Sequence, residues 1–554
     1  MKGRCVLEQI QIKNIRSLKD TGLITLRPIN VLVGNNSSGK STFLRTFPLI
    51  KQSISKYTDG PILWAGDVDD YVDFGSFKET ITNDKCSDSI ELTFVFDRKR
   101  IDALFAPFSF SLPLLKRIEP CDEDNLLDTC YSLVIKSRGD TENCGEYVSK
   151  AIFNISTHML EIEYSTDAQI NAVFLDGAKI LLPPVEDDGM IRYGYYLTKS
   201  YLYTSKTVFG TKLPQYDSRV DDLRSTMMPW FDKKGKGRVN IKSERTLLSL
   251  IYIVGELLCR NVSVTELTKK YKDLYDVDDS DPESLTREIS VVEQRLKGYN
   301  ETHRDAIVRD FLFIYFCAYL PDINKYLSDY FSQVHYIAPV RATAERYYRL
   351  RNTAIDDIDH QGKNLAIFLN SLSRERLHAF QTWTTDHFGF KTFVQRESGH
   401  LSVNVELQKS TGRFNLSDTG FGYSQILPII TQLWMLSTKE KTTHSSTPLI
   451  VAIEQPELHL HPSLQAKLAK VFIASIKLAL QHGYQLQLIL ETHSETIVNY
   501  FGTAIAKGEL SPNDISVILF DKCLGCQYTE VSVTSYDESG YLKDWPIGFL
   551  SAGE

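Results

Sequence analysis

The sequence predicts an α/β fold in which a mixed sheet, flanked by helices, is divided into two halves by a large, mainly helical insertion. Three short apolar runs lead to this expectation, at residues 29–33, 449–453 and 485–490. Such predominantly apolar runs are typical of parallel strands buried on both faces. The first run leads into a glycine-rich loop, and the second begins 416 residues after the first ends (449 − 33). The chain between them must therefore leave the sheet and return to it.

The other elements are predicted around these three strands. Alternating patterns predict strands at 5–13, 24–26 and 88–97, several strands within 150–205, and strands at 333–341 and 401–407. Helical patterns occupy 243–275, 283–297, 306–331, 363–388, a segment from about 424, and 463–482. We therefore expect an N-terminal half at 1–100, an insertion at 101–332 and a C-terminal half at 333–554.

Composition excludes several classes of protein. A chain of 554 residues suggests two to four domains. The net charge of −8 argues against a generally basic nucleic-acid binder. Nine scattered cysteines, an odd number, do not form a disulfide framework. The first residues lack the apolar run of a signal peptide, and no run is long enough for a membrane helix. We expect a cytoplasmic protein.

The strongest motif is the glycine-rich loop after the first apolar run. It fits G-x-x-x-x-G-K-[ST] and consists of Gly34, Asn35, Asn36, Ser37, Ser38, Gly39, Lys40, Ser41 and Thr42. Glycines allow backbone N–H groups to converge on phosphate oxygens, and the following helix presents its positive end to the anion. Lys40 can reach the β- and γ-phosphates, and Ser41 can bind Mg²⁺. The sequence therefore predicts an ATP site.

A phosphate loop needs an acidic residue on the metal side, and the second apolar run supplies one. Glu454 follows this strand at its carboxyl end, where ligands of open α/β sheets bind. We therefore expect Glu454 to join Ser41 at the metal. Gln455 comes next, and a glutamine can orient a water molecule but cannot act as a general base.

Two further segments contain polar residues at strand or helix ends. His493 follows the third apolar run, where it could sense or stabilise the γ-phosphate. A second phosphate-sized site is predicted at the start of the helix near 424, from Asp418, Gly420, Gly422, Ser424 and Gln425. Since this chain already has its own phosphate loop, the nucleotide of a partner subunit is the natural candidate for that site.

These motifs, in this order, resemble the ABC-type ATPase heads of the SMC, Rad50 and OLD group. The resemblance identifies residues 34–42 as Walker A, 449–454 as Walker B, 416–425 as a divergent signature segment, 458–462 as the D-loop and His493 as the switch histidine. It implies a homodimer that holds two ATP molecules and Mg²⁺ between its heads. Most such heads have Asp-Glu where this chain has Glu454-Gln455, which implies slow hydrolysis.

Three segments resemble a narrower bacterial branch that is frequent in anti-phage defence, the PtuA ATPases of Septu systems. They begin at Tyr336, Glu454 and Asp544. This resemblance implies an HNH nuclease partner similar to PtuB and, in retron versions, a reverse transcriptase with its multicopy single-stranded DNA. The alternatives are a DNA-repair or recombination ATPase of the RecF or Rad50 type, and an OLD-like ATPase associated with nuclease activity.

Two basic segments could contact nucleic acid. One extends from Lys233 to Arg238, and the other, which interleaves arginines with tyrosines, extends from Arg341 to Arg351. A solvated face or ion pairs within the domain are the favoured explanation of each segment, by a small margin. The His459–His461 pair has the spacing of metal ligands but no third ligand, so we favour a contact at the nucleotide or the dimer interface.

Overall fold

The computed structural model describes residues 6–56, 60–67, 70–82, 89–97, 100, 129–138, 145–155, 158–167, 170–180, 323–350, 357–408, 412–439, 447–522 and 528–543, with single positions between 265 and 320. The chain divides into two compact units. The first contains residues 1–57, 62–92 and 329–554, and the second contains 58–61 and 93–328. Both ends of the chain therefore belong to the first unit.

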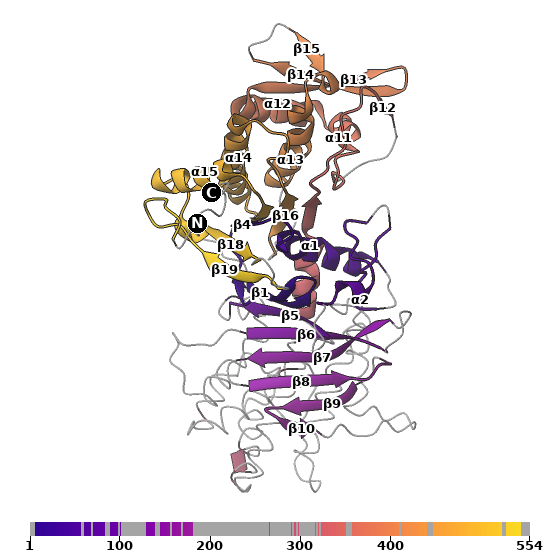
Figure 1. The fold of residues 1–554 in the computed structure, drawn as a ribbon, viewed down its shortest axis with the longest axis vertical. Coiled ribbons are helices and arrows are strands. Elements are labelled where there is room, and N and C mark those ends of the chain that lie inside the picture. The colour runs from indigo at the N-terminus through magenta and orange to yellow at the C-terminus, as the bar shows by residue number, and fades with distance from the viewer. Residues whose placement is uncertain are drawn as a thin grey trace, which may run out of the picture. The chain divides into compact units, whose positions relative to one another are not determined.

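A six-stranded sheet forms the centre of the first unit (Figure 1). Its strands, in spatial order, are β11 (Val334–Ile337), β16 (Leu449–Glu454), β17 (Leu486–Glu491), β4 (Ile29–Gly34), β18 (Ile515–Asp521) and β19 (Glu530–Thr534). All neighbours are parallel except β18 and β19. The expected mixed sheet is therefore confirmed.

Helices cover both faces of this sheet, which explains the predominantly apolar runs. In β4, β16 and β17 every residue is buried. Alternate strand residues such as Val31 pack with α13 (Phe421–Ser437), α14 (Pro462–Gln481) and α15 (Glu495–Ala506) in one core. On the other face, Phe43 of α1 (Lys40–Ser55) contacts Phe520 of β18, with ring centroids 5.9 Å apart.

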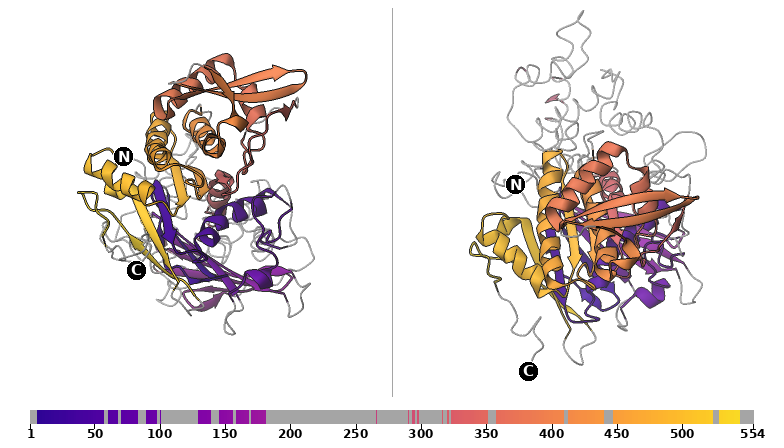
Figure 2. Two further views of the ribbon diagram at one scale, coloured as in Figure 1. Left: turned by 45° about the horizontal axis from the view of Figure 1, so that its top comes forward. Right: turned by 90° about the horizontal axis from the view of Figure 1, so that it is seen from above.

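The sheet joins segments from the two ends of the described chain. β4 pairs with β17 on one side and with β18 on the other. The Asn30 side chain also donates a hydrogen bond to the Leu488 carbonyl oxygen at 3.1 Å. In both views of Figure 2, the indigo N-terminal segment lies beside yellow C-terminal strands. The loop that follows β4 is thus positioned by strands that come more than 450 residues later in the chain. One of these strands, β17, ends at Glu491.

A second, antiparallel sheet of the first unit contains β12 (Tyr348–Arg349), β14 (His400–Leu407), β13 (Phe390–Glu397) and β15 (Arg413–Asn415). It packs against α11 (Leu365–Ser371) and α12 (Arg374–Phe388). The helix predicted at 363–388 is therefore two helices. The break occurs where Ser373 caps α12, its side chain accepting a hydrogen bond from the Arg376 backbone N–H.

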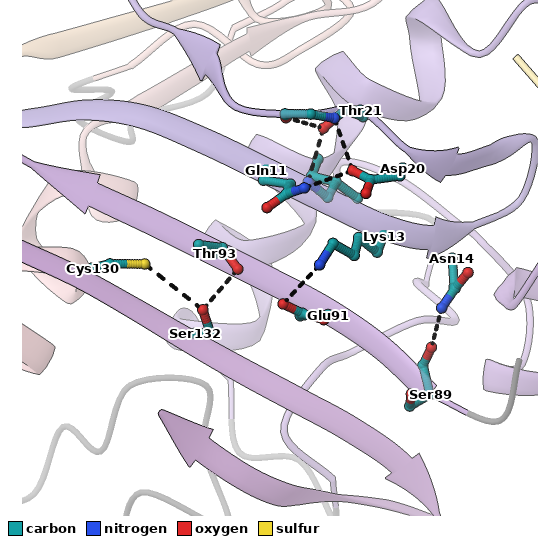
Figure 3. A network of polar contacts seen from close by, with 12 residues as sticks. Gln11, Lys13, Asn14, Asp20, Thr21, Ser89, Glu91, Thr93, Cys130 and Ser132 are labelled. Atoms are coloured by element: carbon teal, nitrogen blue, oxygen red, sulfur yellow. Dashed lines mark hydrogen bonds and ion pairs between the residues drawn. The ribbon is translucent and has the colours of Figure 1, made fainter. Parts of the chain in front are cut away.

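The N-terminal strands of the first unit are antiparallel. β1 (Leu7–Ile15) pairs with β2 (Leu18–Asp20) and β3 (Ile24–Thr25). Polar side chains join these strands to the start of β5 (Ser89–Phe96): Lys13 contacts Glu91 at 3.2 Å, and the Asn14 amide donates to the Ser89 carbonyl oxygen (Figure 3). The short helix α2 (Phe77–Thr80) has a capping box made by Ser76 and Glu79.

The described strands of the second unit form an antiparallel meander. They are β6 (Thr129–Ser137), β7 (Glu146–Ile155), β8 (His158–Tyr164), β9 (Ile170–Leu175) and β10 (Ala178–Ile180), joined in chain order. The Thr93 hydroxyl lies 2.8 Å from that of Ser132 (Figure 3). The helices expected at 243–275 and 283–297 lie almost entirely outside the described residues, whereas the described end of the helix expected at 306–331, residues 323–331, is helical.

Sequence reasoning did not find α15, β18 or β19, although it found the three buried parallel strands. Within the described part of the chain, no helix combines the length and the apolar character that crossing a membrane requires.

One contact in the first unit can be tested through stability. An alanine Cβ at position 502, inside α15, would lie 2.3 Å from the carbonyl oxygen of Gly540. Replacing a helical glycine by alanine normally stabilises a protein by up to about 1 kcal/mol. Here we expect Gly502→Ala to lower the free energy of unfolding by about 1–3 kcal/mol, because the helix and the Gly540 turn must move apart. Urea unfolding measures this change, with the exposed Thr503→Ala in the same helix as control. An increase in stability would show that the contact is not tight.

Candidate functional site

The glycine-rich loop is shaped for an anion. It leaves β4 at Gly34 and enters α1 through Gly39, whose φ of 93° lies in the left-handed region. A Cβ at Gly39 would lie 2.7 Å from the Ser17 hydroxyl, so a side chain is excluded by both backbone and space. No side chain caps the N-terminus of α1. Its first N–H groups therefore point toward the loop without a side-chain partner, as a phosphate site requires.

Lys40 is held inside this loop by the loop's own backbone. Its ammonium group donates to the carbonyl oxygens of Gly34 at 3.0 Å and of Asn35 at 2.7 Å. Burial lowers the pKa of Lys40, while the nearby carboxylates of Glu491 and Glu457 act in the opposite direction. An anion bound in the loop would give the Lys40 ammonium group a negatively charged partner in direct contact.

The loop lines a pocket of about 460 Å³. Besides residues 36–42, its walls contain Arg16, Ser17, Gln455, Glu491 and His493. The structure therefore brings Gln455 and His493 to the phosphate loop from segments more than 400 residues away. Sequence analysis did not single out Arg16, Ser17 or Glu491.

Glu491 contributes a carboxylate at the start of α1. Ser41 donates its hydroxyl hydrogen to Oε1 of Glu491 at 2.8 Å. The other oxygen, Oε2, is buried and has no hydrogen-bond partner in the described structure. Burial, together with the negative charge of Glu454, raises the pKa of Glu491 to about 7. A signal existed in the sequence, since Glu491 ends the third apolar run as Glu454 ends the second.

Glu454 does not occupy the expected place beside Ser41. Its carboxylate forms a two-point ion pair with Arg45, with Nε–Oε1 and Nη2–Oε2 distances of 2.6 and 2.8 Å. Tyr336 donates a third hydrogen bond to Oε1 at 2.8 Å. The Glu454 side chain is only 2% exposed and does not line the pocket. In this structure the hydrogen-bond partner of Ser41 is thus Glu491, and the metal role expected of Glu454 together with Ser41 stays a prediction.

The geometry of α1 explains this division. Ser41 and Arg45 are four residues apart, so they lie on the same face of the helix, one turn of about 5.4 Å from each other. Glu491 and Glu454 are paired in register at the ends of the neighbouring strands β17 and β16, which are about 4.8 Å apart. Because the two spacings nearly match, each helix residue meets one carboxylate.

Gln455 and His493 are positioned by the backbone at these strand ends. Gln455 has a φ of 42°, and its N–H donates to the Glu491 carbonyl oxygen at 2.9 Å. The N–H of His493 donates to the carboxylate of Glu457 at 2.7 Å. Burial lowers the pKa of His493, and the charge of Lys40 lowers it further. The imidazole is therefore favoured in its neutral form near neutral pH.

The predicted signature residues lie apart from this pocket. None of Asp418, Gly420, Gly422, Ser424 and Gln425 lines it. Asp418 is exposed and pairs with Arg346 at 2.6 Å, and Gly420 begins α13 without a side-chain cap. Ser424 and Gln425, in contrast, are buried within the chain itself, at 5% and 4% exposure. The prediction that these two contact a nucleotide of a partner therefore does not fit their burial in α13.

The predicted basic segment starting at Arg341 also needs correction. Arg341 is 3% exposed and donates to the carbonyl oxygens of Glu454 and Gln455, at 2.9 and 3.2 Å. Burial lowers its pKa to about 10. Arg341 thus supports the strand end and cannot contact nucleic acid in this conformation, whereas Arg346 and Arg349 are exposed. Arg351 and the segment from Lys233 to Arg238 lie outside the described residues.

The histidine pair after Glu457 has a structural explanation in part. His461 caps α14, its ring nitrogen accepting a hydrogen bond from the Ser463 N–H at 3.3 Å. Across the described ranges, no three His, Cys, Asp or Glu side chains form a cluster that could hold a metal ion. A zinc site at His459 and His461 is not supported.

The residues of the pocket fit the phosphates of a nucleotide. The hydroxyl oxygen of Ser38 is fully buried in the loop and lacks a partner in the described structure. Together with the uncapped start of α1 and the ammonium group of Lys40, it supplies the donors that a bound triphosphate needs. Gly34–Thr42 would hold the phosphates, and the hydroxyl of Ser41 would face their metal ion.

The raised pKa of Glu491 predicts a pH-dependent stability. In the unfolded chain this carboxyl titrates near its ordinary value of 4.5, and in the folded chain near 7. Stability is thus fully present below pH 4.5 and is lost as the pH rises through 7. In metal-free and nucleotide-free buffer, we expect Glu491→Gln to be more stable than the wild type above pH 7, by on the order of 2 kcal/mol, with the difference vanishing near pH 4.

Urea unfolding at several pH values measures this difference. The control is Glu495→Gln, which removes one negative charge from an exposed position four residues away. A stability difference for Glu491→Gln that does not change with pH would contradict a buried, titrating carboxylate.

Comparison with known proteins places this site in a family. Among solved structures, the SMC head domain from Thermotoga maritima is similar over 95% of this chain and 98% of its own, at 9% identity and a TM-score of 0.32. No curated protein matched the sequence. The sequence matches the AAA ATPase domain family over residues 6–188 and 322–498, which is more than half of its length and includes the phosphate loop, Glu454, Gln455, Glu491 and His493. The chain therefore belongs to the AAA ATPase domain family.

Proposed function

We propose that this chain is an ABC-type ATPase head of the SMC and Rad50 kind, which binds ATP with Mg²⁺ and hydrolyses it slowly. The observation that carries this proposal is the pocket in which the phosphate loop meets Gln455, Glu491 and His493. A phosphate site with a metal-side carboxylate and a water-orienting amide has the parts that phosphoryl transfer to water requires.

Slow hydrolysis is supported by the position of Gln455. Gln455 lines the pocket where an attacking water would be activated. Arg341 donates a hydrogen bond to the backbone carbonyl oxygen of Gln455, and the backbone N–H of Gln455 donates to the Glu491 carbonyl oxygen. An amide can orient this water but cannot accept its proton. Glu457 is buried and bonded to the Thr492 hydroxyl and the His493 N–H, so it does not replace a base at position 455.

A homodimer with ATP between its heads is supported by the exposed part of the signature segment. Asp418 is exposed, and Gly420 has open space around its Cβ position and starts α13 with uncapped N–H groups. Because this segment does not line the chain's own pocket, its anion-binding character suits the nucleotide of a second copy. Asp418 and Gly420 to Gly422 are the residues that would make this contact, rather than the buried Ser424 and Gln425.

The cellular role that best suits these features is regulation of a separate nuclease in bacterial anti-phage defence. The support is the sequence resemblance to PtuA ATPases in the segments that begin at Tyr336 and Glu454. An HNH nuclease similar to PtuB would be the partner, with a reverse transcriptase and its multicopy DNA in retron versions. ATP bound between two heads would then hold the complex in one state until slow hydrolysis releases it.

Replacing Lys40 tests the proposed nucleotide site. We expect Lys40→Ala to weaken ATP binding by at least about 100-fold in equilibrium dialysis, because a buried ammonium group that pairs with two phosphates is removed. Nucleotide-dependent dimerisation, measured by sedimentation velocity, should be lost with it. The control is Lys470→Ala, an exposed lysine of α14. Normal ATP binding by Lys40→Ala would refute the phosphate-loop assignment.

Gln455→Glu tests the reason for slow turnover. We expect it to raise kcat for ATP hydrolysis by about tenfold or more, because a carboxylate can accept the proton of the attacking water. Gln455→Ala, which removes the amide without adding a base, should not raise kcat. Phosphate release in a coupled assay measures both. Unchanged turnover in Gln455→Glu would mean that position 455 does not limit hydrolysis.

A further inference from the structure

We propose that Glu491, and not Glu454, is the carboxylate that binds Mg²⁺ beside the nucleotide, and that Glu454 is a positioning residue. The inference rests on the proposed ATP site. The metal ligand would thus come from β17, the strand that pairs with the phosphate-loop strand β4. It would not come from β16, which lies on the far side of β17.

The position of Glu491 meets the needs of an Mg²⁺ ligand. Mg²⁺ in nucleotide sites takes one or two protein oxygens and completes its octahedron with phosphate oxygens and water. The Ser41 hydroxyl is 2.8 Å from Glu491 Oε1, so both oxygens can face one ion at the start of α1. Oε2 of Glu491 is buried without a hydrogen-bond partner in the described structure, and the residue lines the pocket. A buried carboxylate oxygen without a donor is costly unless a cation or a donor arrives.

Glu454 meets the opposite conditions. Both of its oxygens already accept hydrogen bonds, two from the guanidinium group of Arg45 and one from the hydroxyl of Tyr336. Its side chain is 2% exposed and does not line the pocket. Turning Glu454 toward the metal would break a two-point ion pair and leave the half-buried Arg45 without its partner, which is unfavourable for a pair whose carboxylate is buried.

The two carboxylates therefore divide two tasks. Glu454 fixes the end of β16 and the start of α1 relative to each other, through Arg45. Glu491, whose strand pairs directly with β4, remains available to a cation next to Ser41. The Mg²⁺ charge would also offset the repulsion between Glu491 and Glu454, which face each other in register.

The test compares binding of a non-hydrolysable ATP analogue in Mg²⁺ and in EDTA, by isothermal titration calorimetry of the full chain. The variants are Glu491→Gln, Glu491→Asp, Glu454→Gln and Lys40→Ala. A second readout is the electron paramagnetic resonance spectrum of Mn²⁺ in the presence of the analogue. We expect Mg²⁺ to tighten analogue binding by at least about tenfold in the wild type and by less than about threefold in Glu491→Gln.

Several matched results support the proposal. Glu491→Gln should bind the free analogue in EDTA at least as tightly as the wild type, because it removes a negative charge near the phosphates. Glu491→Asp should regain part of the Mg²⁺ effect, and Glu454→Gln should keep the effect while lowering the thermal midpoint. Among the three carboxylate variants, bound Mn²⁺ should be lost only in Glu491→Gln.

Other results overturn the proposal. If Glu454→Gln removes the Mg²⁺ effect and Glu491→Gln keeps it, Glu454 is the ligand. If Glu491→Gln keeps both the Mg²⁺ effect and bound Mn²⁺ but loses turnover, Glu491 acts on the attacking water. Failure of the wild type to bind the analogue in either buffer, or normal binding by Lys40→Ala, would instead refute the ATP site itself.

Discussion

The pairing of β4 with β17, and of β17 with β16, is the constraint on which the site depends. These three parallel strands end at one edge of the sheet, at Gly34, Glu491 and Glu454. Parallel strands align their carboxyl ends, so a phosphate loop after the first strand necessarily meets the side chains that end the other two. A shift of one residue in either pairing would turn these carboxylates to the opposite face.

The sequence predicted this edge well because its signals are local. A buried run followed by a glycine-rich loop and a helix is recognisable without knowledge of distant residues, and so are the ends of the other two strands. What could not be predicted is which side chain meets which. The contact of Arg45 with Glu454 joins residues 409 positions apart, and no local pattern encodes it. The four-residue spacing of Ser41 and Arg45 is visible in the sequence. That each of these residues meets a different carboxylate depends on the distance between β16 and β17, which the sequence does not show.

The limits of prediction in the C-terminal half have a similar cause. Gly420, Ser424 and Gln425 occur together in sequence, and a glycine-rich helix start suggests an anion site for all of them. The helix that begins at Phe421 then turns Ser424 and Gln425 into the core while Gly420 stays at the surface. Arg341 likewise resembles part of a basic surface in the sequence, yet the fold places it beneath the end of β16. Burial, which depends on the whole fold, decides these cases.

The arrangement of the central sheet also bears on how the protein is made. β4 is among the first segments to leave the ribosome, but its two neighbours, β17 and β18, are synthesised more than 450 residues later. Until then the phosphate loop has no sheet to support it, and contacts between such distant segments form slowly. A growing or truncated chain that stops before Ile515 therefore contains the complete loop sequence and still lacks a strand that holds it. The complete pocket at the phosphate loop can therefore form only after segments from both ends of the described chain have been synthesised.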